Sequence, residues 1–373
     1  MKKDWIIKKL GEICDIYQPQ TISTKQLVDN GEYLVYGANG IIGHYDKYNH
    51  EESEILLTCR GATCGSVNVS LPFSWINGNA MVIHPINTNI SKEYLKYVLT
   101  SLDYSHIITG AAQPQITRQT LSPITIPVPP LEEQKQIVAV LDKKFEQIET
   151  LKTAAEKNLQ NTKQLFQAEL EKIFSNTSWE RVLLSEIALD FSRGKSKHRP
   201  RNDKILFGGD YPFIQTGDIR NSDKYVTEYT ETYNETGLAQ SKLWPEGTLC
   251  ITIAANIAET AILTFPCCFP DSIIGFIPNE KRTTVDYIYY VIQFFKAELQ
   301  KLSKGAAQDN LNLANLESMK FPLPPLEEQK RIVAHLDSLS EKVHQLEEIY
   351  TKQLADCDEL KQAFLHKAFE GEL

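Results

Sequence analysis

The chain has 373 residues, of which 42% are hydrophobic and 23% charged, and its net charge is −9. This length leaves room for two or three domains, and the composition is that of an ordinary globular protein. No apolar run reaches the roughly 18 residues of a membrane span, and the first ten residues lack an apolar core long enough for a signal peptide. The seven cysteines form no Cys-x-x-Cys pair. We therefore expect a cytoplasmic protein with reduced thiols, no membrane contact and no metal site.

Residues 1–128 are predicted to form a first small domain of mixed helix and strand. Short β-branched segments at 55–58 and 80–84 are bounded by turn-forming residues, which is typical of strands. Residues 91–102 have a helical pattern, with Ser91 placed to cap the first turn. This mixture favours a small α+β domain.

Residues 129–175 begin with Pro-Pro-Leu-Glu-Glu-Gln and continue as one long helical pattern. Proline fits the first helical position, and the two glutamates face the positive end of the helix dipole. No glycine or proline interrupts the run, and apolar residues alternate near spacings of three and four, as in a coiled coil. These positions are Ile137, Leu141, Phe145, Ile148, Ala155, Leu159, Thr162, Phe166 and Ile173.

Residues 176–323 are predicted to form a second α+β domain, with strands at 249–253, 261–265 and 273–277 and a helix at 285–302. Near its start, residues 193–204 carry six basic side chains and one acidic one, with a glycine at 194. A basic loop of this kind suits contacts with phosphate groups. A solvated loop, or a surface for an acidic protein partner, is the alternative.

Residues 324–373 are predicted to form a second long helix, because Pro-Pro-Leu-Glu-Glu-Gln recurs at 324–329, 195 residues after its first copy at 129–134. Its apolar positions follow the same spacing. They are Ile332, Leu336, Leu339, Val343, Leu346, Tyr350, Cys357, Leu360 and Phe364.

The two halves of the chain match beyond this hexapeptide. Trp5 and Trp179 open them in the same way, and 93–99 pairs with 286–292 in the same order along the chain. Such a pattern indicates an internal duplication. If the first helix leads away from the first domain, the second must return, so the helices are antiparallel. The predicted fold class is α+β, with two globular mixed domains separated by two long antiparallel coiled-coil helices and related by pseudo-twofold symmetry.

The second copy carries extra residues, chiefly 218–247. A length-variable segment on a shared scaffold suggests that this segment distinguishes the two domains. Its basic and aromatic residues, which include Lys224, Tyr229 and Tyr233, are of the kinds that reach base edges. Neutral variation in loop length is the alternative.

The motifs of catalysis are absent from the sequence. No phosphate-binding Gly-x-x-x-x-Gly-Lys loop, no Gly-x-Gly-x-x-Gly cofactor loop and no Asn/Asp-Pro-Pro-aromatic run occurs. The carboxylates Asp271 and Glu280 lack the spacing of a nuclease pair. We therefore assign no catalytic residue and no metal ligand, and interpret the chain as a binding protein.

Basic, amide and aromatic side chains are the candidates for contacts with DNA phosphates and base edges. In the first domain they are scattered, and an ion pair within the protein is an equal alternative for Arg60. In the second they lie in the basic loop and in the extra segment. The candidates are Lys25, Asn39, Lys47, Arg60, Arg193, Lys195, Lys197, Arg199, Arg201, Arg220, Tyr225 and Lys242.

The duplicated Pro-Pro-Leu-Glu-Glu-Gln helix starts, the two domains opened by tryptophan and the terminal run Ala-Phe-Glu-Gly-Glu-Leu at 368–373 resemble the DNA specificity subunit of type I restriction–modification systems. The resemblance covers essentially the whole chain. It implies that each domain is a target-recognition domain reading one half of a split, asymmetric site in double-stranded DNA. It also implies that the helices set the spacing and carry two methyltransferase subunits.

On this resemblance, no cofactor is expected on this chain. S-adenosylmethionine is expected on the methyltransferase partners, and ATP with Mg²⁺ on separate motor–nuclease subunits. Two other interpretations remain open at this point. One is a self-sufficient methyltransferase or nuclease, and the other is a coiled-coil adaptor without a role on DNA.

Overall fold

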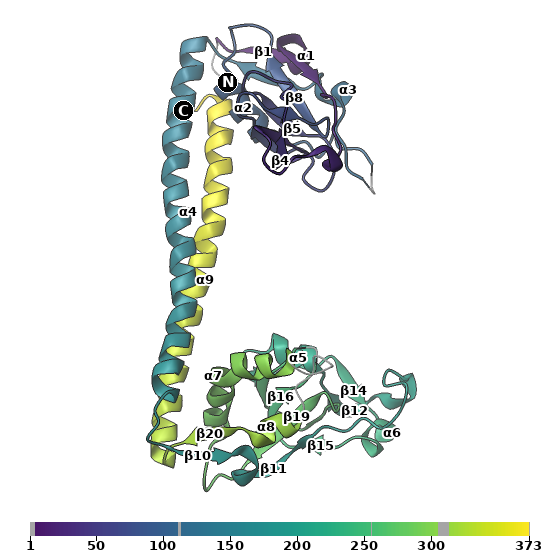
Figure 1. Ribbon diagram of the computed structural model, residues 1–373, viewed down its shortest axis with the longest axis vertical. Coiled ribbons are helices and arrows are strands. Elements are labelled where there is room, and N and C mark those ends of the chain that lie inside the picture. Colours follow the sequence, from purple (N-terminus) through teal and green to yellow (C-terminus); the bar gives the residue numbers. More distant parts are fainter. Residues whose placement is uncertain (1–3, 111–112, 255, 305–312, 373) are drawn as a thin grey trace. The chain divides into compact units, whose positions relative to one another are not determined.

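The computed structural model describes residues 4–110, 113–254, 256–304 and 313–372. The chain divides into two compact units, the first made of Met1–Lys157 and Tyr350–Leu373 and the second of Asn158–Ile349. Each unit is a mixed α/β domain with parts of two long helices, α4 and α9 (Figure 1). Within the described ranges, no helix combines the length and the hydropathy that a membrane crossing needs.

Two sheets and a separate strand pair build the first unit. The larger sheet is antiparallel, in the order β2 (Cys14–Tyr17), β8 (Ala80–Pro85), β5 (Ile55–Thr58), β6 (Val67–Val69). The smaller has the order β4 (Ile41–Tyr45), β3 (Tyr33–Tyr36), β7 (Trp75–Ile76), with β3 and β7 parallel. The strand pair is β1 (Ile6–Lys9) with β9 (Thr125–Val128), and the short helices are α1 (Leu10–Ile13), η1 (Thr24–Gln26), α2 (Lys92–Ser101) and α3 (Arg118–Leu121).

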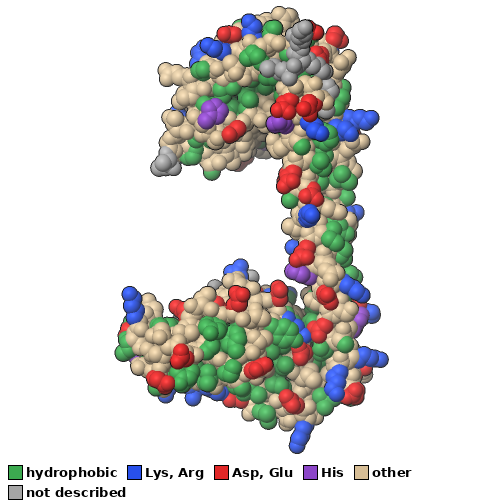
Figure 2. Space-filling model, turned by 180° about the vertical axis from the view of Figure 1, so that it is seen from behind, with side chains coloured by type: hydrophobic (Ala, Val, Ile, Leu, Met, Phe, Trp, Pro, Cys, Tyr) green, Lys and Arg blue, Asp and Glu red, His purple; other side chains and the backbone are tan. Residues whose placement is uncertain are grey.

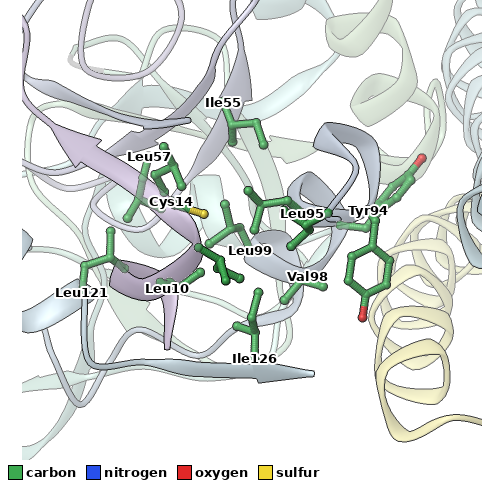
Figure 3. Packing of buried hydrophobic residues seen from close by; sticks show 14 of the residues in the cluster. Leu10, Cys14, Ile55, Leu57, Tyr94, Leu95, Val98, Leu99, Leu121 and Ile126 are labelled. Atoms are coloured by element: carbon green, nitrogen blue, oxygen red, sulfur yellow. The ribbon is translucent and has the colours of Figure 1, made fainter. Parts of the chain in front are cut away.

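The core of the first unit lies between the larger sheet and α2. Leu10, Leu57, Leu95 and Leu99 converge there and are fully buried (Figure 3). The predicted cap of α2 is confirmed, because the Ser91 side chain accepts a hydrogen bond from the backbone N–H of Tyr94 at 3.0 Å.

The second unit repeats this plan, with one more strand in each sheet. One has the order β11 (Ala188–Arg193), β19 (Ile273–Pro278), β16 (Leu249–Thr252), β17 (Thr260–Leu263), β13 (Tyr225–Val226). The other has the order β14 (Glu231–Tyr233), β12 (Phe207–Phe213), β18 (Cys267–Cys268), β15 (Leu243–Trp244). The strand pair is β10 (Glu180–Leu183) with β20 (Lys320–Leu323), and the helices are η2 (Leu184–Glu186), η3 (Lys204–Leu206), α5 (Thr216–Asn221), α6 (Glu235–Ala239), α7 (Val285–Lys304) and α8 (Leu313–Ser318).

The strand pairings confirm the internal duplication. The order β2-β8-β5-β6 in the first unit matches β11-β19-β16-β17 in the second, and β4-β3-β7 matches β14-β12-β18. The parallel pairing of β3 with β7 recurs as β12 with β18. The second unit has one more strand in each sheet, β13 and β15, and both come from the extra segment 218–247.

The long helices are α4 (Leu131–Phe174) and α9 (Leu326–Glu370). In the first unit they run antiparallel, because Glu149 pairs with Lys361 and Lys152 with Asp358, so that partners on α9 fall in number as those on α4 rise. In the second unit the two helices also touch, with His335 3.1 Å from Glu169. The predicted apolar positions are buried or half-buried, with two exceptions. Leu346 and Leu360 are exposed, so the prediction that they belong to the seam is wrong.

Each copy of the hexapeptide ends in a buried glutamine. Gln134 donates to the carbonyl oxygens of Pro129 and Asn89 and accepts from the N–H of Ser91, all within 2.9 Å. Gln329 makes the equivalent set of hydrogen bonds in the second unit. Both are fully buried. Each glutamine therefore ties the start of a long helix to the segment that leads into α2 or α7.

Candidate nucleic-acid interface

The basic loop, which we define as residues 193–203, joins β11 to η3. At Gly194 the backbone N–H donates to the Ile273 carbonyl at 2.8 Å. A Cβ at Gly194 would lie 2.3 Å from the Phe269 oxygen and 2.4 Å from the Pro270 oxygen, so only glycine allows this close approach. The loop therefore leaves the sheet along one fixed path.

The extra segment holds the basic loop from the other side. The side-chain oxygen of Gln240 accepts from the backbone N–H groups of Lys197, at 2.6 Å, and His198, at 3.1 Å. The Ser241 hydroxyl donates to the Lys195 carbonyl at 3.0 Å. These bonds use only the backbone of the loop. The side chains of Lys195 and Lys197 are exposed, and neither forms an ion pair with a described residue.

The two arginines that follow are held by the protein. Arg199 donates to the carbonyl of Ser196 at 2.6 Å and to that of His198 at 2.8 Å. Arg201 forms an ion pair with Asp271 at 2.6 Å. The loop is thus braced by its arginines, while Lys195 and Lys197 form no ion pair with a described residue.

His198 contacts Asp203 at the end of the basic loop. His198 lies 2.9 Å from Asp203, and this hydrogen bond lowers the pKa of the Asp203 carboxyl. The same carboxylate accepts from the backbone N–H of Ile205 at 3.2 Å, which also lowers its pKa. Asp203 therefore stays ionised at neutral pH and caps the short helix η3.

A cavity of about 500 Å³ lies beside the basic loop. Polar groups come from the loop, from β14 and from the residue before α5, and the ring of Phe213 comes from β12. The lining residues are Ser196, Arg201, Asn202, Lys204, Phe207, Gly208, Phe213, Gln215, Glu231, Pro270 and Ser272.

Tyr225, which we predicted as a DNA contact, takes part in a contact between the extra segment and the helices. Its hydroxyl donates to Asp286 on α7 at 2.9 Å. The adjacent Lys224 lies 2.8 Å from Asp286 and 2.6 Å from Asp337 on α9. Burial lowers the pKa of Lys224, but its hydrogen bonds to these two carboxylates outweigh that effect and raise it. We therefore interpret this part of the extra segment as a brace, and a DNA contact by Tyr225 stays a prediction.

Lys242 also has partners within the protein. Its ammonium group forms an ion pair with Asp190 at 2.5 Å and lies 3.4 Å from the ring centroid of Trp244. Burial raises the pKa of Asp190, but hydrogen bonds from Lys242 and Ser192 outweigh it, so that the pKa is lowered. The negative charge of Asp190 offsets that of Lys242, so Lys242 attracts a DNA phosphate less strongly than an unpaired lysine does.

The other candidates of the extra segment differ in exposure. Tyr233 is fully buried and stacks on Phe213, so it cannot reach a base edge without leaving the core. Arg220, at the end of α5, and Arg193, at the start of the basic loop, are exposed. Both therefore remain candidates for phosphate contacts.

In the first unit, the structure brings Asn39 and Arg60 to neighbouring loops. The Thr58 hydroxyl, at the end of β5, donates to the carbonyl of Ala38 at 2.5 Å, and Asn39 accepts from Asn68 at 2.7 Å. Arg60 pairs through its backbone with Gln115. The remaining candidates, Lys25 in η1 and Lys47 after β4, are exposed. Among the residues that the structure describes, no contact joins Lys25 or Lys47 to Arg60.

Sequence reasoning missed Lys204, Gln215 and Glu231, which line the cavity. Gln215 and Glu231 lie 16 residues apart and meet only because β12 pairs with β14. Lys204 belongs to the run of basic residues at 193–204, and this run could have identified it from the sequence as a candidate. Over residues 4–110, 113–254, 256–304 and 313–372, no group of three or more His, Cys, Asp or Glu side chains has the arrangement of a metal site.

Two units with one repeated strand order, each with parts of the two long helices, make this a duplicated two-domain protein. The family model of the "Type I restriction modification DNA specificity domain" matches residues 2–160 and again 176–354. The chain belongs to this family, and it carries the domain twice.

Curated proteins that are similar to this chain belong to the same family. A putative type I restriction enzyme specificity subunit of Haemophilus influenzae is 26% identical over 88% of this chain and 86% of that protein. The MjaVIII specificity subunit of Methanocaldococcus jannaschii is 26% identical over 100% and 93%.

Solved structures show the same fold. A chain from a study of the assembly of the type I R-M system matches with a TM-score of 0.81 at 22% identity, over 100% of this chain and 99% of that one. The HsdS subunit from Thermoanaerobacter tengcongensis matches with a TM-score of 0.61 at 21% identity, over 100% and 98%.

Proposed function

We propose that this chain is the non-catalytic specificity subunit of a type I restriction–modification complex, and that each globular domain reads one half of a bipartite, asymmetric DNA site. The observation that carries the proposal is one scaffold used twice with different surfaces. The strand order is shared, while the basic loop and strands β13 and β15 belong to the second unit. Two unlike readers on one scaffold suit an asymmetric site.

The helices are the proposed platform for two methyltransferase subunits. Leu151 and Leu165 on α4 are 58% and 51% exposed, and Leu346 and Leu360 on α9 are 36% and 43% exposed. The leucines at 346 and 360 follow those at 151 and 165 by 195 residues, which is also the offset of the hexapeptide. The face seen in Figure 2 has hydrophobic side chains among charges of both signs along these helices.

A repeated apolar surface suits two copies of one partner. Leu151 and Leu360 adjoin the ion pairs Lys152–Asp358 and Glu149–Lys361, so they lie at the same level of the helix pair in the first unit. Leu165 and Leu346 belong to the second unit. Exposed leucines at equivalent places in a duplicated chain are the pattern expected of two like docking sites.

In this proposal the chemistry belongs to the partners. S-adenosylmethionine is bound by the methyltransferase subunits, and ATP with Mg²⁺ by motor–nuclease subunits. This chain recognises the DNA and assembles the complex, and it does so in the cytoplasm.

The test is purification of the chain with its methyltransferase partner, followed by competition among DNA duplexes at a stated salt concentration near 150 mM, since phosphate contacts weaken steeply with salt. We expect a stable complex with a sequence preference. Leu151→Asp together with Leu360→Asp should weaken partner capture. The control is Gln160→Asp, which adds a charge at an exposed polar position of α4 and should leave capture unchanged.

Two results would contradict the proposal. Tight binding of S-adenosylmethionine by the isolated chain would favour a self-sufficient methyltransferase. Capture of partners without any preference among duplexes would favour a coiled-coil adaptor.

A further inference from the structure

We infer that the cavity beside the basic loop is where the second unit reads a base, that Gln215 and Glu231 select this base, and that it is an adenine presented in the major groove. This inference rests on the proposed function and adds the site and the residues that discriminate.

The cavity has a rigid aromatic side. The ring of Phe213 stacks on Tyr233, with centroids 4.1 Å apart, and Phe207 lies 5.8 Å from Phe213. Tyr233 is fully buried, so the wall is anchored in the core. The volume of about 500 Å³ is within the range of sites that hold a small group, and the edge of a base is such a group.

The orientation of Gln215 is fixed by its neighbours. Its amide nitrogen donates to a carboxylate oxygen of Glu231 at 2.7 Å. An ionised carboxylate only accepts hydrogen bonds, so the nitrogen of the amide must face Glu231. The backbone N–H of Gln215 donates to Asp218 at 2.7 Å, which holds the residue in place. The amide oxygen and the second amide hydrogen remain for a ligand.

This set of groups matches adenine. In the major groove adenine presents the N6 amino group as a donor beside the N7 acceptor, and a glutamine side chain pairs with both. Guanine presents two acceptors there, O6 and N7. An acceptor beside the Glu231 carboxylate is repelled, whereas an amino group is attracted. The pair should therefore prefer adenine to guanine.

Cations in the lining of the cavity suit the phosphates that flank such a base. Lys204 is exposed and forms no ion pair in the part of the chain that the structure describes. Arg201 is held by Asp271 through one of its nitrogens, and a guanidinium has five N–H donors, so donors remain for a phosphate oxygen. The lining of the cavity thus combines the discriminating groups with positive charge.

The experiment selects binding sites from a randomised duplex library, using the full chain purified with its methyltransferase partner. We expect Gln215→Ala to reduce the preference for adenine over guanine at one position of one half-site by roughly 5- to 100-fold, and to leave the other half-site unchanged. Glu231→Gln keeps the size of the side chain and should lose preference at the same position. Lys204→Ala should weaken binding equally for all sequences.

The matched controls are Gln353→Ala on the exposed face of α9 and Glu246→Gln in the exposed turn before β16, which should keep the unmodified preference. An unchanged preference in both Gln215→Ala and Glu231→Gln overturns the inference, and so does a uniform loss of affinity with preference intact. Competition by excess deoxyadenosine monophosphate would identify a free-nucleotide site and would also overturn it. If the unmodified complex shows no sequence preference, the proposed function fails as well.

Discussion

The two buried glutamines show how single residues give a short repeated motif its role. Gln134 and Gln329 each bridge three backbone groups that belong to separate parts of the chain. The sequence predicted a helix start at each hexapeptide, and a helix begins there, at Leu131 and Leu326. The role of the glutamine was not predictable, because its distant partners lie 43 to 47 residues earlier.

Gln134→Ala should lower the free energy of unfolding by about 1–3 kcal/mol, because the Ser91 N–H and two carbonyls lose their partner in a buried place. Gln329→Ala should do the same for the second unit. Thermal or denaturant unfolding measures the effect, and the exposed Gln136→Ala is the control on the same helix. Equal stability of Gln134→Ala and Gln136→Ala would show that these buried bonds contribute nothing.

Lys224 provides a test that depends on pH. Its folded pKa is raised above the unfolded value, so its contribution to stability is complete below the unfolded pKa and is lost as the pH rises through the folded one. Lys224→Met should cost about 1–2 kcal/mol at neutral pH, since Asp286 and Asp337 lose their shared partner but are partly hydrated. The difference from the unmodified chain should shrink at strongly alkaline pH, where Lys224 loses its proton.

The control for Lys224 is the exposed Lys281→Met, which removes a lysine that pairs with no acidic group among the described residues. A loss of stability in Lys224→Met that stayed constant across the alkaline range would show that packing, and not the ion pairs, is responsible.

At the scale of elements, the extra segment has two roles, and its amino-acid composition did not predict which part has which role. One part, around Lys224 and Tyr225, braces α7 and α9. Another, at Gln240 and Ser241, holds the basic loop. Strands 55–58, 249–253 and 273–277 were predicted nearly as they occur, because β-branched runs between turns form strands. Which cations are unpaired depends on ion pairs across the fold, and no local pattern gives these.

The basic loop makes the electrostatic prediction. Lys195→Ala with Lys197→Ala should weaken DNA binding for all sequences and reduce the salt slope by about two, at roughly 0.9 per phosphate contact. Binding titrations at several salt concentrations measure this. Lys281→Ala is the control for general loss of charge. A salt slope equal to that of the unmodified chain would remove these lysines from the phosphate contacts.

For the molecule as a whole, duplication explains why two domains with different surfaces share one scaffold. The duplication was predictable from sequence, since matched anchors recur in order, and the strand orders confirm it. The addition of one strand to each sheet of the second unit was not, because β13 and β15 have only two residues each and take their position from neighbouring strands.

The long helices make a prediction about spacing. Removing 152–158 from α4 together with 352–358 from α9 deletes one heptad from each helix, and the Lys152–Asp358 ion pair shows that the two deleted segments face each other. One heptad is about 10 Å of helix, close to three base pairs of DNA. The spacing between half-sites should change by about that amount while both half-sites keep their sequence. A changed half-site sequence with the old spacing would contradict a spacer role for the helices.

The decisive experiment is a map of methylated adenine in the DNA of a host with and without this chain, its methyltransferase partner being present in both. We predict methylation that depends on the chain and falls in a motif of two unlike blocks separated by a fixed number of unspecified bases, with only one block altered by Gln215→Ala. Methylation that is independent of the chain, or that follows one continuous motif, would contradict a specificity subunit with two unlike readers.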